Sequence, residues 1–318
     1  MSSENQKQIS EKYPKIGFAF GSGAAKAICQ FGILKRLYEE NIPISYVTGS
    51  SMGAVVAAVF ALGLDVDIAI EKALRYAEAS NINNLKNFNF LHESVYKKDF
   101  TNNLLGELFA DFTFEDCKIP LAVTAVDLES GKLVILDKGP IVPAVRASTS
   151  LPGVFEPVLM NGYYLVDGGL LEDCPIPTIR QKSQSDIVIG SYITDLKARQ
   201  EISGYIYNKF FSKKKNKNFF ESKIDKIKND LSLLAGIVLR SLEILRIELW
   251  HYKLKEAKPD ILIEINIEKV NLFDFKKTND LIKIGEDAFD KIYPQLKKLI
   301  EQKKKELNGP GKNAKLES

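Results

Sequence analysis

Short apolar runs alternate with longer segments of helical periodicity in the first part of the chain. Residues 16–20 form one such run and 44–48 form another, and both are typical of buried strands. Between them, residues 24–40 carry apolar side chains at three-residue steps, which predicts a helix. Residues 51–62 and 66–79 have the composition of two further helices. This order of strand, helix, strand and helix predicts a mostly parallel sheet covered by helices.

The remainder of the chain continues this alternation, with one long interruption. Further strands are predicted at residues 121–126, 133–136, 163–166, 187–193 and 261–267, and a closing helix at 280–307. The interruption is a basic stretch that runs into a Leu- and Ile-rich helical segment at 231–252. Because the sequence has no internal repeat and no Ser/Gly linker, we expect one α/β domain. Its expected boundaries are 15–307, with an insert at about 197–258 and loosely ordered or disordered ends at 1–14 and 308–318.

The composition, 45% hydrophobic and 27% charged residues, is that of a globular protein and excludes a disordered chain, a collagen-like fibre and a disulfide scaffold. No apolar run approaches the about 20 residues that a membrane-spanning helix needs. The polar residues 1–15 lack the apolar core of a secretory signal, and the three cysteines are too far apart for a zinc motif. We therefore expect a cytoplasmic protein, peripheral at the membrane if it binds lipid, with signal-free secretion as an alternative.

The net charge of +3 conceals a strongly basic segment. Residues 197–228 hold ten Lys or Arg against three acidic residues, a local charge of +7. Aromatic residues and lysines interleave there, which suits anionic head groups and an apolar lipid layer. The predicted membrane contacts are Phe210, Phe211, Phe219, Phe220, Lys213, Lys214 and Lys215.

A solvated, flexible loop is an equally good interpretation of this basic segment. Nucleic-acid binding is not expected, because no stacking platform or recognition motif accompanies the charge. The helical segment at 231–252 is interrupted by charged residues, so packing in the core or in a homodimer suits it better than crossing a membrane.

A G-x-S-x-G pattern follows directly after the second predicted strand, with Ser51 at its centre between Gly49 and Gly53. At such a strand-to-helix junction, a sharp turn exposes the serine hydroxyl, and the flanking glycines leave room for the turn. The N-terminus of the following helix favours a developing negative charge. Ser51 is therefore the candidate nucleophile. A tight turn without chemistry is the alternative.

A second small-residue turn, at residues 21–26, follows the first predicted strand. A right-handed crossover between adjacent parallel strands would place this turn and Ser51 at the same edge of the sheet. Backbone amides of the turn would then be available as an oxyanion hole, at Ser22, Gly23 and Ala24. A dinucleotide-binding loop is the competing interpretation, but Lys26 stands where G-x-G-x-x-G has its last glycine.

A serine nucleophile also needs a base. The sequence has two histidines, and a structural or surface role suits both His92, in a loop-like stretch, and His251, in an apolar-rich helix. Asp167 is the better candidate, because it follows a short strand and two glycines leave its carboxylate unobstructed. Partial burial would raise the pKa of this carboxylate and let it accept the serine proton. An Asp-Gly-Gly turn that only shapes a loop is the alternative.

Taken together, these turns resemble those of the patatin-like phospholipases, lipid acyl hydrolases with a Ser-Asp dyad. The resemblance extends from Ile16 to about Leu299 and includes residues 146–155, which are similar to the family's A-S-x-S-x-P-x-x-F block. It implies a three-layer α/β/α patatin-like fold with a mostly parallel central sheet. It also implies that Ser51 is the nucleophile, that Asp167 is the base and that Lys26 occupies the family's conserved basic position.

The glycine-rich turn departs from the family at Ser22, Ala24 and Ala27, where glycine is common; the form GSGAA[RK] is similar to that of a bacterial subgroup. Alanine at position 27 is compatible with an oxyanion hole made of amides if its φ is negative.

The expected function is hydrolysis of carboxylic esters in phospholipids or lysophospholipids. The alternatives are an esterase or acyltransferase acting on other acyl esters, and a non-catalytic membrane-binding protein. No metal and no cofactor are expected, because His and Cys are scarce and no carboxylate cluster stands out.

Overall fold

The structure, a computed structural model, describes residues 13–79, 104–152, 155–194, 223–267 and 277–308. Its strands are β1 Ile16–Phe20, β2 Ile44–Ser50, β3 Leu121–Asp127, β4 Leu133–Leu136, β5 Val158–Met160, β6 Tyr163–Asp167, β7 Ile187–Thr194 and β8 Ile261–Asn266. The α-helices are α2 Cys29–Glu39, α3 Met52–Leu62, α4 Val66–Ala79, α6 Ile141–Ser148, α7 Ile176–Lys182, α9 Lys223–Ala257 and α10 Thr278–Asn308. Short 3-10 helices are η1 Ala24–Ile28, η3 Phe114–Asp116 and η4 Gly168–Leu170.

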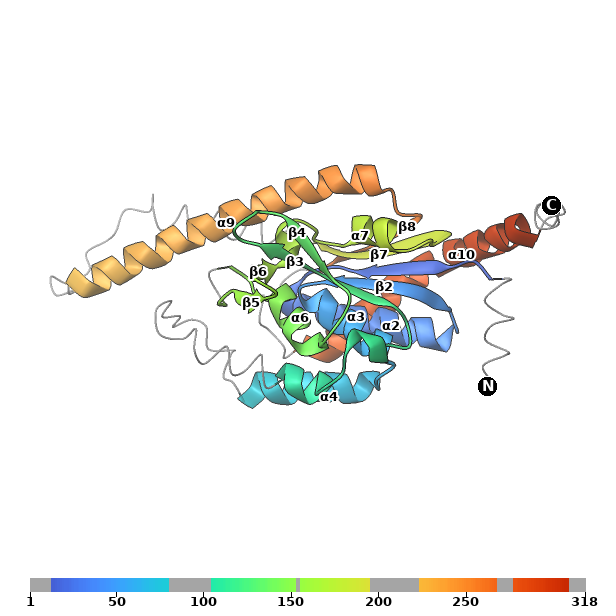
Figure 1. The fold of residues 1–318 in the computed structure, drawn as a ribbon, viewed down its shortest axis with the longest axis horizontal. Helices are drawn as coiled ribbons and strands as arrows, with labels where there is room; N and C mark the ends of the chain where they lie inside the picture. The colour runs from blue at the N-terminus through green and yellow to red at the C-terminus, as the bar shows by residue number, and fades with distance from the viewer. Residues whose placement is uncertain (1–12, 80–103, 153–154, 195–222, 268–276, 309–318) are drawn as a thin grey trace.

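These strands form one eight-stranded sheet in the order β5-β6-β3-β2-β1-β7-β8, with β4 also paired to β3. Strands β3, β2, β1, β7 and β8 run parallel, whereas β4 and β6 are antiparallel to β3, and β5 is antiparallel to β6. Helices lie on both faces of the sheet (Figure 1), as crossovers between parallel strands require. The predicted α/β class, a mostly parallel central sheet flanked by helices, is confirmed.

The side chains of β1 alternate between two apolar clusters, one on each face of the sheet. Phe18 and Phe20 belong to the larger cluster, which includes residues of α2, α3 and α10. Ala19 belongs to the smaller cluster, with Ile176 of α7 and Trp250 of α9. A strand buried on both faces needs apolar residues at every position, which explains the uninterrupted run at 16–20.

Helices α2 and α10 pack at very short distance in the larger cluster, because a glycine on each lets the backbones touch. A Cβ atom on Gly32 would lie 2.0 Å from the backbone oxygen of Ile282, and one on Gly285 would lie 1.7 Å from that of Cys29. Both distances are far below van der Waals contact. Any larger residue at either position would push the two helices apart.

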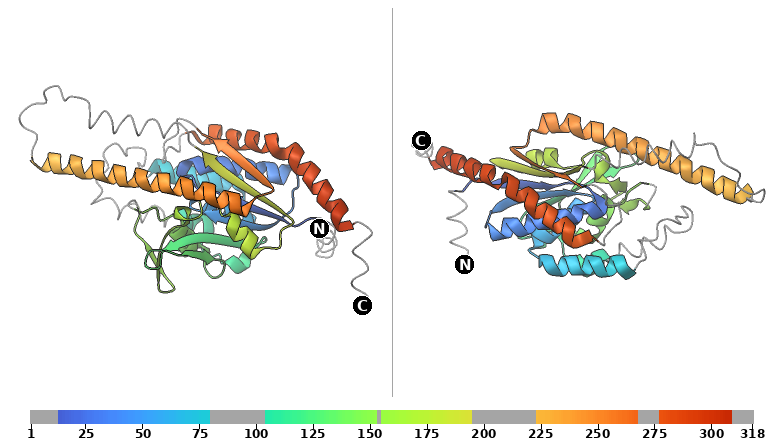
Figure 2. Two further views of the ribbon diagram at one scale, coloured as in Figure 1. Left: turned by 90° about the horizontal axis from the view of Figure 1, so that it is seen from above. Right: turned by 180° about the vertical axis from the view of Figure 1, so that it is seen from behind.

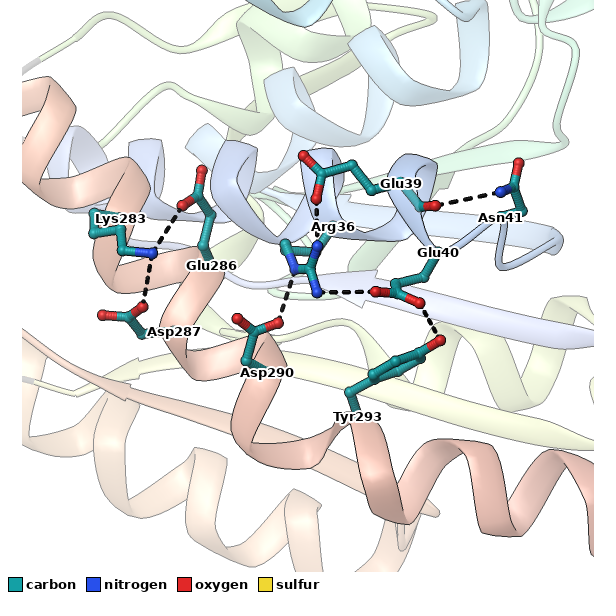
Figure 3. A network of polar contacts seen from close by, with 9 residues as sticks. All are labelled: Arg36, Glu39, Glu40, Asn41, Lys283, Glu286, Asp287, Asp290 and Tyr293. Carbon is teal, nitrogen blue, oxygen red and sulfur yellow. Dashed lines mark hydrogen bonds and ion pairs between the residues drawn. The ribbon is translucent and has the colours of Figure 1, made fainter.

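A polar network continues this helix pair toward solvent (Figure 3). Arg36 of α2 forms ion pairs with Glu39, with Glu40 at 2.9 Å and, across the interface, with Asp290 of α10 at 2.8 Å. Tyr293 of α10 donates its hydroxyl hydrogen bond to Glu40. The hydrogen bonds that Arg36 donates to Glu39 and Asp290 raise its pKa above its usual range. The network therefore fixes the rotation of α10 against α2.

Helix α9 is longer than the sequence predicts. The segment expected at 231–252 extends over Lys223–Ala257, because the lysines that precede it are good helix formers. Its N-terminal part reaches beyond the edge of the sheet (Figures 1 and 2). Its C-terminal part is anchored by Trp250, which is buried and packs against the ring of Tyr192, with ring centroids 4.8 Å apart and ring planes inclined by 31°.

Among the strands and α-helices given above, the sequence prediction lacks β5, α6 and α7. Strand β5 has three residues, too few for a recognisable alternation. Helices α6 and α7 are short and carry Pro143 and Pro177 in their first turns, where proline is tolerated because the first amides of a helix have no intrahelical acceptor. Proline weakens the helical pattern in the sequence without preventing the helix.

The register of β3 determines where the site forms. Strand β2 pairs with residues 121–124 of β3 and ends with Ser50 opposite Thr124. Strand β6 pairs with residues 125–127 and ends with Asp167 opposite Ala125. Since β4 covers residues 123–126 along the other edge of β3, the strands β2 and β6 share one edge and meet end to end. The residue that follows β2 therefore lies beside the last residue of β6.

Candidate active site

Ser51 follows β2 in a strained turn that leads into α3. Its φ of 55° and ψ of −133° are unusual for a residue with a side chain. The two flanking glycines are required by close backbone approach. A Cβ atom on Gly53 would lie 2.3 Å from the backbone oxygen of Phe20, and one on Gly49 would lie 2.5 Å from the Cα of Ala54. The turn thus packs directly against the end of β1, as the motif predicts.

The hydroxyl of Ser51 and the carboxylate of Asp167 are in direct contact. Ser51 Oγ donates to Asp167 Oδ2 at 2.6 Å, and the Gly169 amide donates to Asp167 Oδ1 at 2.7 Å. Both carboxylate oxygens therefore accept a hydrogen bond, which fixes the orientation of the side chain. The structure brings together the two residues that the sequence proposes as nucleophile and base.

Burial determines the acidity of Asp167, whose side chain is 4% exposed. Desolvation raises the pKa of Asp167 to about 6, against the opposing effects of the hydrogen bonds from Ser51 and Gly169 and of the positive charge of Arg246. The nearby Asp173 raises it slightly further. At pH 7 to 8 the carboxylate is thus ionised, yet more basic than an ordinary aspartate. These are the properties that a proton acceptor for a serine needs.

The segment that contains Ser148 and Ser150 supports both members of this pair, a role that the motif alone does not reveal. The Ser51 amide donates to Ser148 Oγ at 2.9 Å, and the Asp167 amide donates to the backbone oxygen of Ser150 at 3.0 Å. Arg146 in turn donates to Ser150 Oγ at 2.6 Å. One turn at the end of α6 thus fixes the backbone of Ser51 and that of Asp167 relative to each other.

The glycine-rich turn after β1 lies next to this pair, with its amides in different environments. The Ser22 amide donates to the backbone oxygen of Asp173 at 2.7 Å, so it is not free to bind an oxyanion in this conformation. No described residue accepts a hydrogen bond from the amide of Gly23 or Ala24. Of the three residues predicted for the oxyanion hole, Ser22 is therefore excluded in this conformation, and the amides of Gly23 and Ala24 stay as the proposed donors.

Two residues of this turn depart from the family's glycines in different ways. Ala27 lies inside η1 and is not among the residues with positive φ. Ala24 has a φ of 48°, a conformation that costs an alanine roughly 1 to 2 kcal/mol relative to glycine. The condition stated for position 27, a negative φ, is thus met, and the strained residue of the turn is Ala24.

A buried glutamine supports the turn from below. Gln30 of α2 is fully buried; its Oε1 accepts from the Gly21 amide at 3.0 Å, and its Nε2 donates to the Gly21 oxygen at 2.8 Å. Ser191 of β7 donates to the same Oε1. Lys26, predicted at the conserved basic position, is 6% exposed and lies in η1 directly after the turn.

The remaining predicted residues lie away from this pair or outside the described part of the chain. His251 is exposed on α9. His92 and all seven predicted membrane contacts, at residues 210–220, lie outside the described residues. Within the described ranges, no group of three or more His, Cys, Asp or Glu side chains is placed to hold a metal ion. None of the described helices combines the length and the apolar character needed to cross a bilayer.

The fold and these contacts define an α/β protein with a serine and an aspartate joined at the carboxyl edge of a mostly parallel sheet. The family model described as patatin-like phospholipase matches residues 18–179, which include both glycine-rich turns, Ser51 and Asp167. The chain belongs to the patatin-like phospholipase family. The resemblance stated on the sequence motifs is confirmed.

Relatives of this chain are longer proteins. An uncharacterised NTE family protein of Mycobacterium bovis is 32% identical over 167 residues, which are 52% of this chain and 46% of that protein. Lysophospholipase NTE1 of Candida glabrata is 27% identical over 310 residues, which are 95% of this chain and 17% of that protein. The crystal structure of VipD from Legionella pneumophila aligns with a TM-score of 0.46 at 14% identity, covering 92% of this chain and 67% of that one. The chain spans less than half the length of both curated relatives.

Proposed function

We propose that the protein is a serine lipid acyl hydrolase that cleaves carboxylic esters of phospholipids or lysophospholipids. The observation that carries this proposal is the 2.6 Å hydrogen bond from Ser51 Oγ to Asp167 Oδ2, made to a buried carboxylate whose pKa is raised to about 6. Membership of the family supports the lipid ester as substrate. One of the relatives is named a lysophospholipase, which favours the same substrate class.

In the first half of the proposed reaction, Ser51 Oγ attacks the ester carbonyl carbon while its proton passes to Asp167 Oδ2. The carbonyl oxygen becomes an oxyanion, which the amides of Gly23 and Ala24 and the N-terminus of α3 stabilise. The bond to the leaving alcohol then breaks, and that alcohol takes the proton from Asp167. The product of this half is an acyl-enzyme on Ser51.

In the second half, water gives a proton to Asp167 and attacks the acyl carbon. The second tetrahedral intermediate uses the same amides. It breaks down to the free fatty acid, and Ser51 recovers its proton from Asp167. One carboxylate thus acts as base and then as acid in each half. The 3.0 Å hydrogen bond of its backbone amide to Ser150 keeps it in place.

Release of fatty acid from phosphatidylcholine and lysophosphatidylcholine micelles, followed by mass spectrometry, tests this proposal. We expect the wild type to release fatty acid and Ser51→Ala to lose at least roughly 100-fold in rate, since the nucleophile is removed. Ser45→Ala is the matched control, because Ser45 lies at the opposite end of β2. Equal rates for Ser51→Ala and wild type would refute the proposal. Ester formation with an added alcohol would instead indicate an acyltransferase.

We also propose that the protein reaches its substrate by contacting a lipid surface. Apolar side chains recur on one face of α9 at Val238, Leu242, Leu245 and Tyr252, and Leu245 and Tyr252 are 66% and 70% exposed. An exposed apolar stripe on a helix suits an interfacial contact, and its spacing also suits pairing with a second copy of α9. Co-sedimentation with phosphatidylglycerol vesicles that is lost in Leu245→Glu supports the lipid surface. A dimer in sedimentation that Leu245→Glu dissociates, without vesicle binding, would assign the stripe to a homodimer.

A further inference from the structure

One face of helix α9 rests on the segment that follows Asp167. Residues Arg246, Trp250 and Lys253 recur at spacings of four and three, so they share this face. Trp250 is buried against β7, and Lys253 Nζ lies 3.7 Å from the carboxylate of Glu172. Arg246 Nη1 donates to Asp173 Oδ1 at 3.1 Å. The inserted helix is therefore tied by two ion pairs to residues close to the proposed base.

Asp173 connects this helix to the glycine-rich turn. Its carboxylate is 4% exposed, and a buried carboxylate stays ionised only with a partner of opposite charge and with hydrogen bonds. Arg246 supplies such a partner. The backbone oxygen of Asp173 accepts the 2.7 Å hydrogen bond from the Ser22 amide. The position of Asp173 thus affects the turn that carries Gly23 and Ala24.

The same arginine acts on the proposed base through its charge. The groups that influence Asp167 come from four places: Ser51 before α3, the Gly169 amide in η4, Arg246 on α9 and Asp173 after η4. Arg246 lowers the pKa of Asp167 and Asp173 raises it, and the effect of Arg246 is the larger of the two. We therefore expect removal of Arg246 to raise the pKa of Asp167.

We propose that Arg246 is a positioning residue of the Ser51–Asp167 pair, which holds the glycine-rich turn in place through its ion pair with the buried carboxylate of Asp173. This inference rests on the proposed function. It makes the docking of α9 a condition of full activity, because the arginine comes from a helix whose described part packs against α7, η4 and Tyr192 of β7.

The test is the pH dependence of kcat/KM with a soluble p-nitrophenyl ester for the wild type, Arg246→Gln, Arg246→Lys and Lys253→Gln. Lys253→Gln is the matched control: it removes the neighbouring ion pair of the same helix face, to Glu172. In Arg246→Gln we expect the fall of kcat/KM at low pH, the acidic limb of the profile, to move to a pH about one unit higher. A shift of this size in a carboxylate pKa is typical when a nearby opposite charge is removed. At pH 9, where Asp167 is ionised in both, kcat should still fall several-fold because the turn has lost its support. Arg246→Lys should restore the position of the limb.

Two outcomes would overturn this proposal: an acidic limb in Arg246→Gln at the wild-type pH, or an equal shift in Lys253→Gln. The second would show that the effect comes from a loosened helix and not from the arginine. Circular dichroism of each variant checks that it is folded. If Ser51→Ala hydrolyses the ester as fast as the wild type, the proposed function itself fails. If Ser51 is essential and Arg246→Gln behaves as the wild type, only the role of Arg246 fails.

Discussion

Replacing Asp167 with Asn should make the protein more stable at alkaline pH while abolishing hydrolysis. An exposed aspartate, as in the unfolded chain, has a pKa of 3.8, whereas the pKa of Asp167 in the folded protein is about 6. The folded state therefore binds this proton more tightly than the unfolded state does. Linkage then requires that the free energy of unfolding decreases as the pH rises from about 4 to 6.

The size of this effect follows from the pKa difference of about two units. At 1.36 kcal/mol per unit, the buried charge costs about 3 kcal/mol at pH 8 and about 1 kcal/mol at pH 4.5. Asparagine has the shape of aspartate, so its oxygen can accept from the Gly169 amide and its nitrogen can donate to Ser51 Oγ. Because neutral hydrogen bonds are weaker than charged ones, we expect a net gain of about 1 to 2 kcal/mol at pH 8.

Urea denaturation of wild type and Asp167→Asn at pH 8 and at pH 4.5 measures this difference. The variant should be more stable at pH 8, and its advantage should shrink at pH 4.5. Asp127→Asn is a control of opposite sign, because hydrogen bonds from Ser130 lower the pKa of Asp127, and that variant should be less stable at pH 8. A stability difference for Asp167→Asn that does not change with pH, or a loss of stability at pH 8, would refute a buried carboxylate with a raised pKa.

Three further predictions follow from the structure. Gly53→Ala would place a Cβ atom 2.3 Å from a backbone oxygen of β1, so kcat/KM for a soluble ester should fall by roughly 100-fold or more, and wild-type kinetics would contradict the close approach. Gly285→Ala would place a Cβ atom 1.7 Å from a backbone oxygen of α2, so we expect the free energy of unfolding measured in urea to fall by about 3 kcal/mol or more. Gly106→Ala, with open space around the new Cβ atom, should leave that free energy unchanged. Equal stabilities of the Gly285→Ala and Gly106→Ala variants would contradict the helix contact. The kcat/KM of the wild type should fall as the pH drops through about 6, when Asp167 takes up a proton, and a flat profile between pH 5 and 8 would exclude it as the base.

The sequence is sufficient to predict that Ser51 pairs with Asp167, but the positions of these two residues are predicted on different grounds. The place of Ser51 follows from strand-to-helix geometry, and the right-handed crossover brings the glycine-rich turn to the same edge of the sheet. The place of Asp167 comes from the family resemblance, since its strand is antiparallel to β3. No local pattern indicates that β6 and β2 share one edge of β3.

What the sequence does not predict are contacts between segments that are far apart in the chain. Ser148 supports Ser51 across 97 positions, and Gly285 packs against α2 across more than 250. Short-range periodicity contains no information about such distances. Helix α9 illustrates a different limit: the sequence predicts most of it as a helix, but the face that is anchored becomes visible only from the buried Trp250 and its ion-paired neighbours in the structure.

Covalent labelling by a serine-reactive fluorophosphonate tests most directly whether Ser51 and Asp167 act together. Intact-protein mass spectrometry at pH 8 compares the wild type, Ser51→Ala and Asp167→Asn. We expect one adduct on the wild type, mapped to Ser51, none on Ser51→Ala, and labelling of Asp167→Asn slowed by roughly 100-fold or more, because the serine has lost its base. An adduct that persists in Ser51→Ala, or an unchanged labelling rate in Asp167→Asn, would contradict a catalytic serine–aspartate pair.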